Sequence, residues 1–292
     1  MDYIIAKYKF IQLIHLILVI AFIAIFYYML SLVAGEDYLN LIQNFIIIFA
    51  IIFVIQIGYM IFTLLIGSYL NVYRITEAPP NIKRMVNEVA AKMNVTPPPT
   101  YIVLDLSPNA FVTYYKGKQT LFINQGLLNI MNEDEIRSVI GHELAHIINN
   151  DVITTVIFTA IAATAINLLH IAVGFFRGQN TRNQAIIVIL GIILSILLII
   201  ISTLLKYSLF RVKEYLADYM SAKYTNKNSM ISALRKLDNF YKQRQVYTDP
   251  VLSNFYIVTS KLENNSIMNI ISNLLSTHPP IDKRIEAIQR SF

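Results

Sequence analysis

Four long stretches without a charged side chain constrain the fold of this chain more than any other feature of its sequence. They span residues 10–35, 38–73, 152–176 and 183–205. A helix of about 20 apolar residues crosses the ~30 Å hydrocarbon core of a bilayer, and each stretch reaches that length. The whole sequence is 55% hydrophobic and 14% charged, whereas typical soluble domains contain ~25% charged residues. We therefore expect a mainly α-helical membrane protein with four transmembrane helices.

The predicted spans divide the chain into four parts. The spans themselves are expected at about 10–34, 41–66, 152–175 and 185–205. They pair into two hairpins, within residues 1–75 and 152–205, and leave residues 76–151 and 206–292 outside the bilayer. Because an even number of spans separates these two segments, they lie on the same side of the membrane. They can therefore form one domain and share a site.

Basic residues beside the predicted spans indicate their orientation. Lys7 and Lys9 precede the first span, and Lys206, Arg211 and Lys213 follow the fourth. Cytoplasmic flanks are enriched in Lys and Arg, so we expect a multi-pass protein of the cell membrane with both termini and both outer segments in the cytoplasm. We interpret the net charge of +6 as reflecting basic residues that lie largely beside the apolar stretches. Since no dense basic block is present, we expect no nucleic-acid partner.

The segments outside the bilayer are predicted to contain mostly helices and a small β-sheet. Stretches rich in strand-forming residues predict strands at 101–106, 109–115 and 120–124, with a turn at 116–118. Capping signals and periodicity predict helices at 81–93, 132–150, 207–224, 228–245, 252–275 and 281–290. The sequence therefore predicts an α+β domain beside the transmembrane helices.

The helix predicted to start after Asn132 carries the motif His142-Glu-Leu-Ala-His146. Residues four apart lie on one face of a helix, so the two imidazoles can bind one metal ion. Glu143 lies about 100° around the helix, beside the metal, where it can take a proton from a metal-bound water. The chain has no cysteine, and the remaining nitrogen and carboxylate ligands are typical of a catalytic zinc. Histidines at this spacing also occur by chance, so a third ligand is needed to decide whether this is a zinc site.

Glu214 is the best-placed third ligand. It follows the fourth predicted span by a few residues, on the same side of the bilayer as the histidine pair. Asp218 shares a helix face with Glu214, so Glu214 can bind zinc while Asp218 accepts the second N–H of a ligand histidine. On its own this pair also fits a solvated helix face. His170 is excluded because a continuing helix would place it roughly 36 Å from His146.

The motifs and their order resemble those of the HtpX-type membrane metalloproteases, which are related to the prenyl-protein zinc proteases. The residues that carry the likeness are His142-Glu143-Leu144-Ala145-His146 with Asn149 and Asp151, Arg211 with Glu214 and Asp218, and Thr277-His278-Pro279-Pro280 with Arg284. The resemblance covers nearly the full chain. It implies a cytoplasmic zincin-like catalytic domain with one zinc ion per chain. It also implies that His142, His146 and Glu214 are the zinc ligands, that Glu143 is the general base and that Asp218 supports a ligand histidine.

The resemblance also implies roles for residues that spacing alone does not single out. His278, with Arg284, resembles the family's group for stabilising the oxyanion, although His278 also fits a helix cap before Pro279. Asn109, Ala110 and Phe111 resemble the edge strand along which such proteases bind their substrate. The alternative for that strand is an ordinary sheet edge. Its continuation, residues 112–115, lacks the family's small, glycine-containing pattern, which affects the expected shape of the substrate pocket.

The function implied is that of a zinc endopeptidase that hydrolyses polypeptides, including misfolded or damaged membrane proteins, with a zinc-bound water activated by Glu143. Three alternatives are an intramembrane-cleaving metalloprotease, a prenyl-peptide processing protease and a non-catalytic metal-binding adaptor. Charged residues on both sides of the motif disfavour the first, and the four-span arrangement disfavours the second. The third would place polar ligands within several spans, where this chain has only His15 and His170. The sequence does not indicate an oligomeric state.

Overall fold

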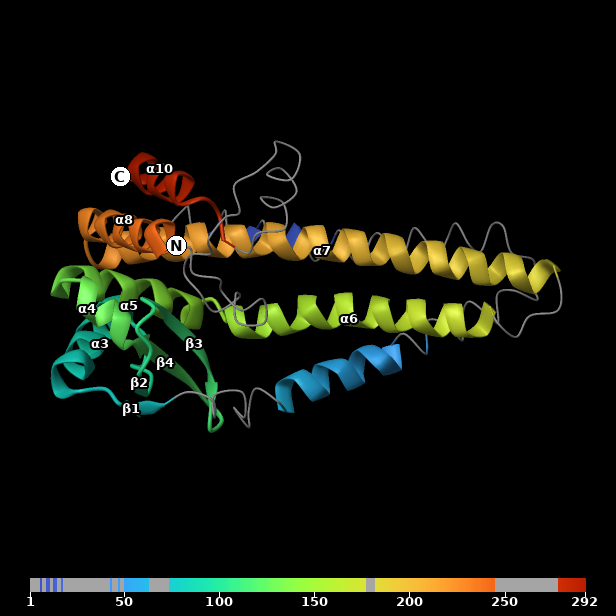
Figure 1. Ribbon diagram of the computed structural model, residues 1–292, viewed down its shortest axis with the longest axis horizontal. Helices are drawn as coiled ribbons and strands as arrows, with labels where there is room; N and C mark the ends of the chain where they lie inside the picture. The colour runs from blue at the N-terminus through green and yellow to red at the C-terminus, as the bar shows by residue number, and fades with distance from the viewer. Residues whose placement is uncertain are drawn as a thin grey trace. The chain divides into compact units, whose positions relative to one another are not determined.

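The computed structural model describes residues 50–62, 74–176, 182–244 and 278–292, with a few isolated positions before residue 50. The chain forms two compact units. The first unit consists of Met1–Tyr8, Thr63–Ile153 and Phe210–Phe292, and the second of Lys9–Phe62 and Thr154–Leu209. The described elements are mostly helical with one small mixed sheet (Figure 1), which agrees with the predicted α-rich fold.

The sheet of the first unit has four strands in the order β1-β2-β4-β3. Its strands are β1 (Ile75–Glu77), β2 (Thr100–Val103), β3 (Ala110–Tyr115) and β4 (Lys118–Asn124). β1 and β3 pair antiparallel with their neighbours, whereas β2 and β4 run parallel. β3 therefore forms one edge of the sheet.

Two of the predicted strand boundaries differ from those observed by more than one residue. The strand predicted at 101–106 ends at Val103, because the chain turns out of the sheet there. The Asp105 amide donates to the Val103 carbonyl (2.8 Å), and the Asp105 carboxylate accepts from the Ser107 amide (2.8 Å). β4 begins at Lys118 because the turn needs only Lys116 and Gly117, which both have positive φ. A two-residue turn of this kind matches the twist of the two strands.

The two faces of the sheet have different partners, as expected from the alternation of side chains along a strand. Ile102, Val112 and Leu121 on one face belong to the main core, which also contains residues of the surrounding helices. On the other face Phe111 and Phe122 stack at 5.1 Å between ring centroids and pack with Val103.

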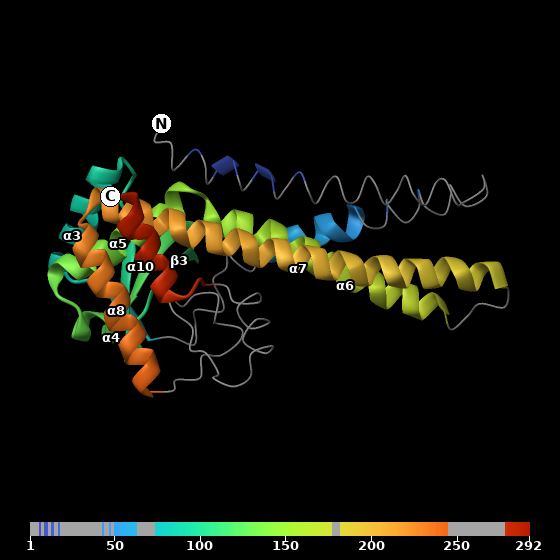
Figure 2. The same ribbon diagram turned by 90° about the horizontal axis from the view of Figure 1, so that it is seen from above.

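The helices of the first unit enclose the main core. They are α3 (Pro80–Met93), α4 (Gln125–Ile130), α5 (Glu133–Ile148), α8 (Lys227–Arg244), α10 (Ile281–Ser291) and the last part of α7 (Arg182–Tyr224). α8 lies against α5 and α10, as Figures 1 and 2 show for these elements. α3, α5, α8 and α10 were predicted within about two residues of their observed ends, whereas β1 and α4 were not predicted. The helix predicted at 252–275 lies outside the described residues.

The predicted division between the fourth span and the next helix is not observed, whereas the predicted end of the metal-binding helix near Asn150 is. α7 is a single helix of 43 residues, so the predicted fourth span and the helix predicted at 207–224 form one element. α5 and α6 (Asp151–Phe176) are separated at Asn149 and Asn150, where Asn150 has a φ of 54°. The bend between α5 and the first part of α6 is 59°.

Among the described residues, no single helix satisfies the length and hydropathy criteria for a membrane span by itself. α5 and Asp151–Ile161 satisfy them only together, as a bent pair. The span predicted at 10–34 lies largely outside the described residues, and the span predicted at 41–66 is described mainly at residues 50–62. The number of spans and the division of the chain into four parts therefore stay predictions.

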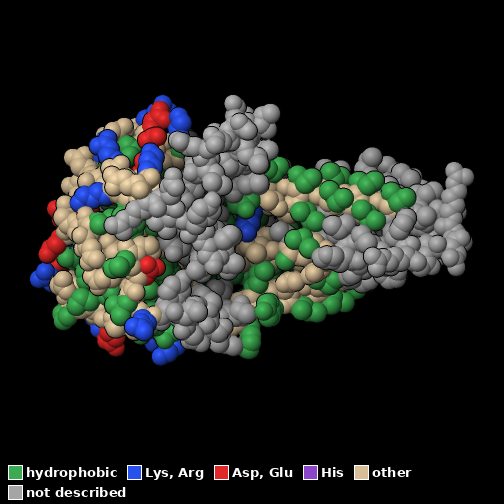
Figure 3. Space-filling view, in the orientation of Figure 1, with side chains coloured by type: hydrophobic (Ala, Val, Ile, Leu, Met, Phe, Trp, Pro, Cys, Tyr) green, Lys and Arg blue, Asp and Glu red, His purple; other side chains and the backbone are tan. Residues whose placement is uncertain are grey.

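The described surfaces of the two units differ in character. Charged side chains gather on the surface of the first unit, whereas green apolar side chains predominate along the described parts of α6 and α7 (Figure 3). Exposed apolar residues on these two helices include Ile153, Ile166, Ile189, Ile193, Ile196, Leu197, Ile200 and Leu204.

Gly126 is required by close contact between the start of α4 and the loop after β2. A Cβ atom at this position would lie 2.1 Å from the Leu106 carbonyl oxygen. The Gly126 amide also donates to the Asp105 carbonyl (2.9 Å), so neither backbone segment can move freely. We expect Gly126→Ala to lower the free energy of unfolding by about 1–3 kcal/mol, a typical cost of overpacking. Denaturant unfolding measures this change, and Asn129→Ala on the exposed side of α4 is the control.

Candidate metal centre

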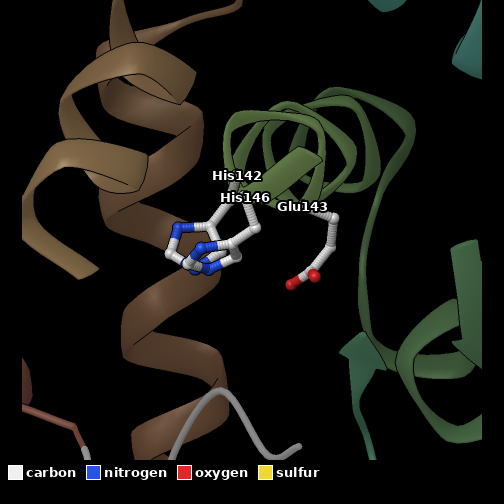
Figure 4. Close-up of side chains that lie close together, drawn as sticks. All are labelled: His142, Glu143 and His146. Atoms are coloured by element: carbon white, nitrogen blue, oxygen red, sulfur yellow. The ribbon is translucent and has the colours of Figure 1, made fainter. Parts of the chain in front are cut away.

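α5 positions the predicted histidine pair because its first turn is fixed by side chains. The Asn132 carboxamide accepts from the Glu135 amide (3.0 Å), and the Glu135 carboxylate accepts from the Asn132 amide (2.8 Å), which completes a capping box. His142 and Glu143 are 1% and 3% exposed. Figure 4 shows the rings of His142 and His146 side by side on one face of α5, with the carboxyl group of Glu143 directed beside them.

α7 approaches α5 closely because the residues where they meet are small. A Cβ atom on Gly141 would lie 3.1 Å from Cγ2 of Thr225 and 3.3 Å from Oγ of Ser221. The Ser221 hydroxyl donates to the Ser138 carbonyl (2.5 Å). This contact brings the predicted residues Glu214 and Asp218 of α7 next to the histidines of α5.

Three predicted metal donors converge on one point. Nε2 of His142 and Nε2 of His146 are 3.2 Å apart. The Glu214 carboxylate lies 3.7 Å from the first nitrogen and 3.5 Å from the second. A tetrahedral ion with bonds of about 2.0–2.2 Å holds its donor atoms roughly 3.3–3.6 Å apart. The spacing of these donors therefore fits zinc to within a few tenths of an ångström.

Each imidazole is oriented by its own aspartate. Nδ1 of His142 lies 3.0 Å from the Asp218 carboxylate, and Nδ1 of His146 lies 2.7 Å from the Asp151 carboxylate. With each Nδ1 beside a carboxylate, the two Nε2 atoms face each other. Burial lowers the pKa of His142, whereas the hydrogen bond and charge of Asp151 outweigh burial and raise the pKa of His146 to about 9. The two nitrogens therefore attract a cation between them, either a proton or a metal ion.

The two glutamates beside the histidines have opposite electrostatic environments. Burial raises the pKa of Glu143 to about 8. Burial would also raise the pKa of Glu214, but the charges of His278 and Arg284 hold it well below its usual range. His142, Glu143 and His146 by themselves also bring one donor atom each within 4.8 Å of one another. Because a carboxyl group must be deprotonated to bind a metal ion, Glu214 is the more suitable ligand of the two, and Glu143 the more suitable base near neutral pH.

Arg284 is fully buried and contacts both carboxylates that α7 contributes. Its guanidinium donates twice to Asp218 (2.7 and 2.6 Å) and lies 3.1 Å from Glu214. Nδ1 of His278 lies 3.0 Å from Glu214. α10 and the residues before it thus bring both predicted residues to the metal donors. The buried position of Arg284 indicates that it holds the two carboxylates in place and does not contact a substrate.

The strand predicted to bind substrate lies at the sheet edge beside α5. Asn109, Ala110 and Phe111 lead into and begin β3, and all three are buried. The Asn124 amide donates to the Asn109 carbonyl (2.9 Å), so the alternate backbone groups of Ala110 and Val112 face away from β4. The Val112 amide donates to the Glu143 carboxylate. The edge strand and the predicted base are therefore in direct contact.

Two residues in this site were not assigned roles from the sequence. Asp151 contacts His146 across the bend between α5 and α6, and the buried Lys213 contacts Asp151. Asp151 follows His146 by five residues, a spacing that a continuous helix would not bring into contact. The pair Asn149-Asn150, which favours left-handed or irregular backbone, was the available signal for a bend here.

A helix that presents two imidazoles and an adjacent glutamate to one point is the arrangement used by HExxH metallopeptidases. The family model of peptidase family M48 matches residues 77–291, and the chain belongs to that family. The protease HtpX homologue of Limosilactobacillus reuteri (strain DSM 20016) is 35% identical over 221 residues, which cover 72% of this chain and 73% of that protein.

Two relatives from distant organisms show a similar degree of likeness. The protease HtpX homologue of Pyrococcus furiosus is 31% identical, with 73% of this chain and 74% of that protein covered. The one from Aquifex aeolicus is 32% identical, with 75% of each chain covered. These similarities confirm the resemblance to HtpX-type metalloproteases.

Proposed function

We propose that the protein is a membrane-bound zinc endopeptidase in which His142, His146 and Glu214 hold the metal ion and Glu143 is the general base. The observation that carries this proposal is the convergence of two imidazole nitrogens and one ionised carboxylate within 3.7 Å of one another. When bound there, zinc would act as a Lewis acid that polarises a carbonyl and makes water a nucleophile at neutral pH.

The protein's own residues supply proton transfer and orientation. Glu143 takes a proton from the attacking water and returns it to the leaving amine, a role that its raised pKa of about 8 supports. Asp218 and Asp151 fix the tautomers of His142 and His146, so that both Nε2 atoms are free of protons when they bind metal.

The substrate would lie along the outer edge of β3. There an extended peptide can pair with the outward backbone groups of Ala110 and with the Val112 carbonyl. In that position its backbone passes close to Glu143, because Glu143 accepts from the Val112 amide. His278 would stabilise the developing oxyanion near Glu214, and Arg284 would keep Glu214 and Asp218 oriented.

Membrane association rests on the apolar stretches and on the exposed apolar side chains of α6 and α7. A water-exposed surface of this kind is costly, whereas a bilayer accommodates it. The proposed cytoplasmic orientation rests on the basic residues beside the predicted spans. Misfolded membrane proteins, cut near the membrane surface, are the substrates that this location favours.

Metal removal and restoration test the proposal. The full chain, purified in detergent, should contain about one zinc ion and cleave both an unfolded soluble polypeptide and a misfolded membrane protein. We expect 1,10-phenanthroline to abolish cleavage, its non-chelating 1,7 isomer to have no effect, and added zinc to restore the rate. Cleavage that persists in the chelator without zinc would exclude the metallopeptidase mechanism, and zinc binding without any cleavage would favour an adaptor.

A further inference from the structure

Lys213 is a buried cation whose contacts lead to the metal donors. It belongs to α7, directly before Glu214, and is 3% exposed. Its ammonium group donates to the backbone carbonyl of Asp151 (2.9 Å) and lies 3.4 Å from the carboxylate Oδ1 of the same residue. The other carboxylate oxygen, Oδ2, is 2.7 Å from Nδ1 of His146. One aspartate thus joins the lysine of α7 to the histidine of α5.

The same order of groups occurs at the other histidine. There Nδ1 of His142 contacts Asp218, and Asp218 accepts two hydrogen bonds from the buried Arg284. At each histidine, Nδ1 therefore contacts a carboxylate, and that carboxylate in turn contacts a buried cation. The parallel is chemical and not a repeat of sequence, because Arg284 comes from α10 and Lys213 from α7.

We propose that Lys213 is a positioning residue for His146, acting through Asp151, as the counterpart of Arg284 at His142. This inference rests on the proposed function, because it takes His146 to be a metal ligand. Two contacts from one ammonium group fix both the backbone and the carboxylate of Asp151. With its carboxylate held, Asp151 keeps the His146 ring in the orientation that directs Nε2 towards Nε2 of His142.

The location of Asp151 explains why such a contact is needed. Asp151 begins α6 directly after the bend at Asn150, so α5 alone does not determine its position. A carboxylate buried without a cation is also costly. Lys213 both fixes the position of Asp151 and supplies the cation, and it does so from the helix that also carries Glu214. The same contact therefore sets the relation between two ligands that come from different helices.

Lys213→Met removes the ammonium group and keeps an unbranched side chain that is one atom shorter. We expect it to weaken zinc binding about tenfold, measured by competition with a chromophoric chelator, since partners of ligand histidines affect affinity by about 10–100-fold. The visible absorption of the cobalt-substituted protein should shift, because the geometry at His146 changes. Lys213→Gln, which keeps a hydrogen-bond donor, is a second variant in case Lys213→Met does not fold.

Lys236→Met is the matched control. Lys236 also donates to a buried carboxylate, that of Glu135 (2.7 Å), but at the far end of α5 from the histidines. It should lower stability and leave zinc affinity and the cobalt spectrum unchanged. Equal loss of zinc affinity in Lys236→Met and Lys213→Met would show a general effect of stability and overturn the inference.

Asp151→Asn and the double variant with Lys213→Met test the route of the effect. If Lys213 acts through Asp151, the double variant should bind zinc no more weakly than Asp151→Asn alone. If the loss of zinc affinity in the double variant equals the product of the losses in the two single variants, the inference is overturned. Wild-type zinc affinity in both Lys213 variants would also overturn it. A wild-type protein that binds no zinc would instead refute the proposed function, so the two failures are distinguishable.

Discussion

Glu143→Gln should abolish most peptide hydrolysis while the protein retains its zinc. General acid–base catalysis contributes about 10²- to 10⁴-fold to a rate, and we expect kcat to fall by this factor. The amide has nearly the shape of the carboxylate, and its oxygen can still accept from the Val112 amide, so the local structure should be preserved. The measurement combines cleavage rates of a quenched fluorescent peptide with zinc analysis of the same samples.

Glu135→Gln is the control for this substitution. Glu135 is likewise a buried glutamate of α5, but it accepts from Ser232 and Lys236 away from the histidines. Its variant should unfold more easily and cleave the peptide at the wild-type rate. If Glu143→Gln cleaves as fast as the wild-type protein, another group must act as the base.

Glu214→Gln should lower zinc affinity by more than about 100-fold, beyond the ~10–100-fold typical of residues that only support a ligand. The neutral amide is a poor zinc ligand, and its partners Arg284 and His278 would lose the charge that they now contact. Competition with a chelator of known affinity measures the loss, and hydrolysis should disappear at zinc concentrations that saturate the wild-type protein.

Asp218→Asn provides the comparison, because Asp218 touches His142 and would not touch the metal. Its loss of affinity should be the smaller of the two. The opposite pattern, in which Glu214→Gln keeps zinc and Glu143→Gln loses it, would reverse the roles of the two glutamates. That outcome is worth testing because Glu143 also lies near both histidines.

The residues that local sequence determines were predicted well. The cap at Asn132 and the spacing of His142 and His146 depend on neighbours in the same helix, and the structure contains both features. Glu214 and Asp218 could also be expected near that pair, since their position after an apolar stretch suggested the same side of a bilayer. The sequence thus indicated the main components of the candidate site.

Contacts that depend on backbone bends and long-range packing were not predictable. The contact between His146 and Asp151 requires the bend at Asn150, and the contact of Lys213 depends on the approach of α7 to that bend. The bidentate pairing of Arg284 with Asp218 joins residues 66 positions apart. The early end of β2 had a similar cause, because hydrogen bonds of Asp105 outweighed the strand preference of the residues around it.

The close approach at Gly141 would make the proposed metal binding and helix association parts of one equilibrium. Gly141 directly precedes His142, and the missing side chain lets α7 lie near enough for Glu214 to face both histidines. An ion bound by ligands from both helices would oppose their separation, and firmer association of the helices would in turn strengthen its binding. By linkage, the folded state should gain stability with the logarithm of the free metal concentration above the dissociation constant.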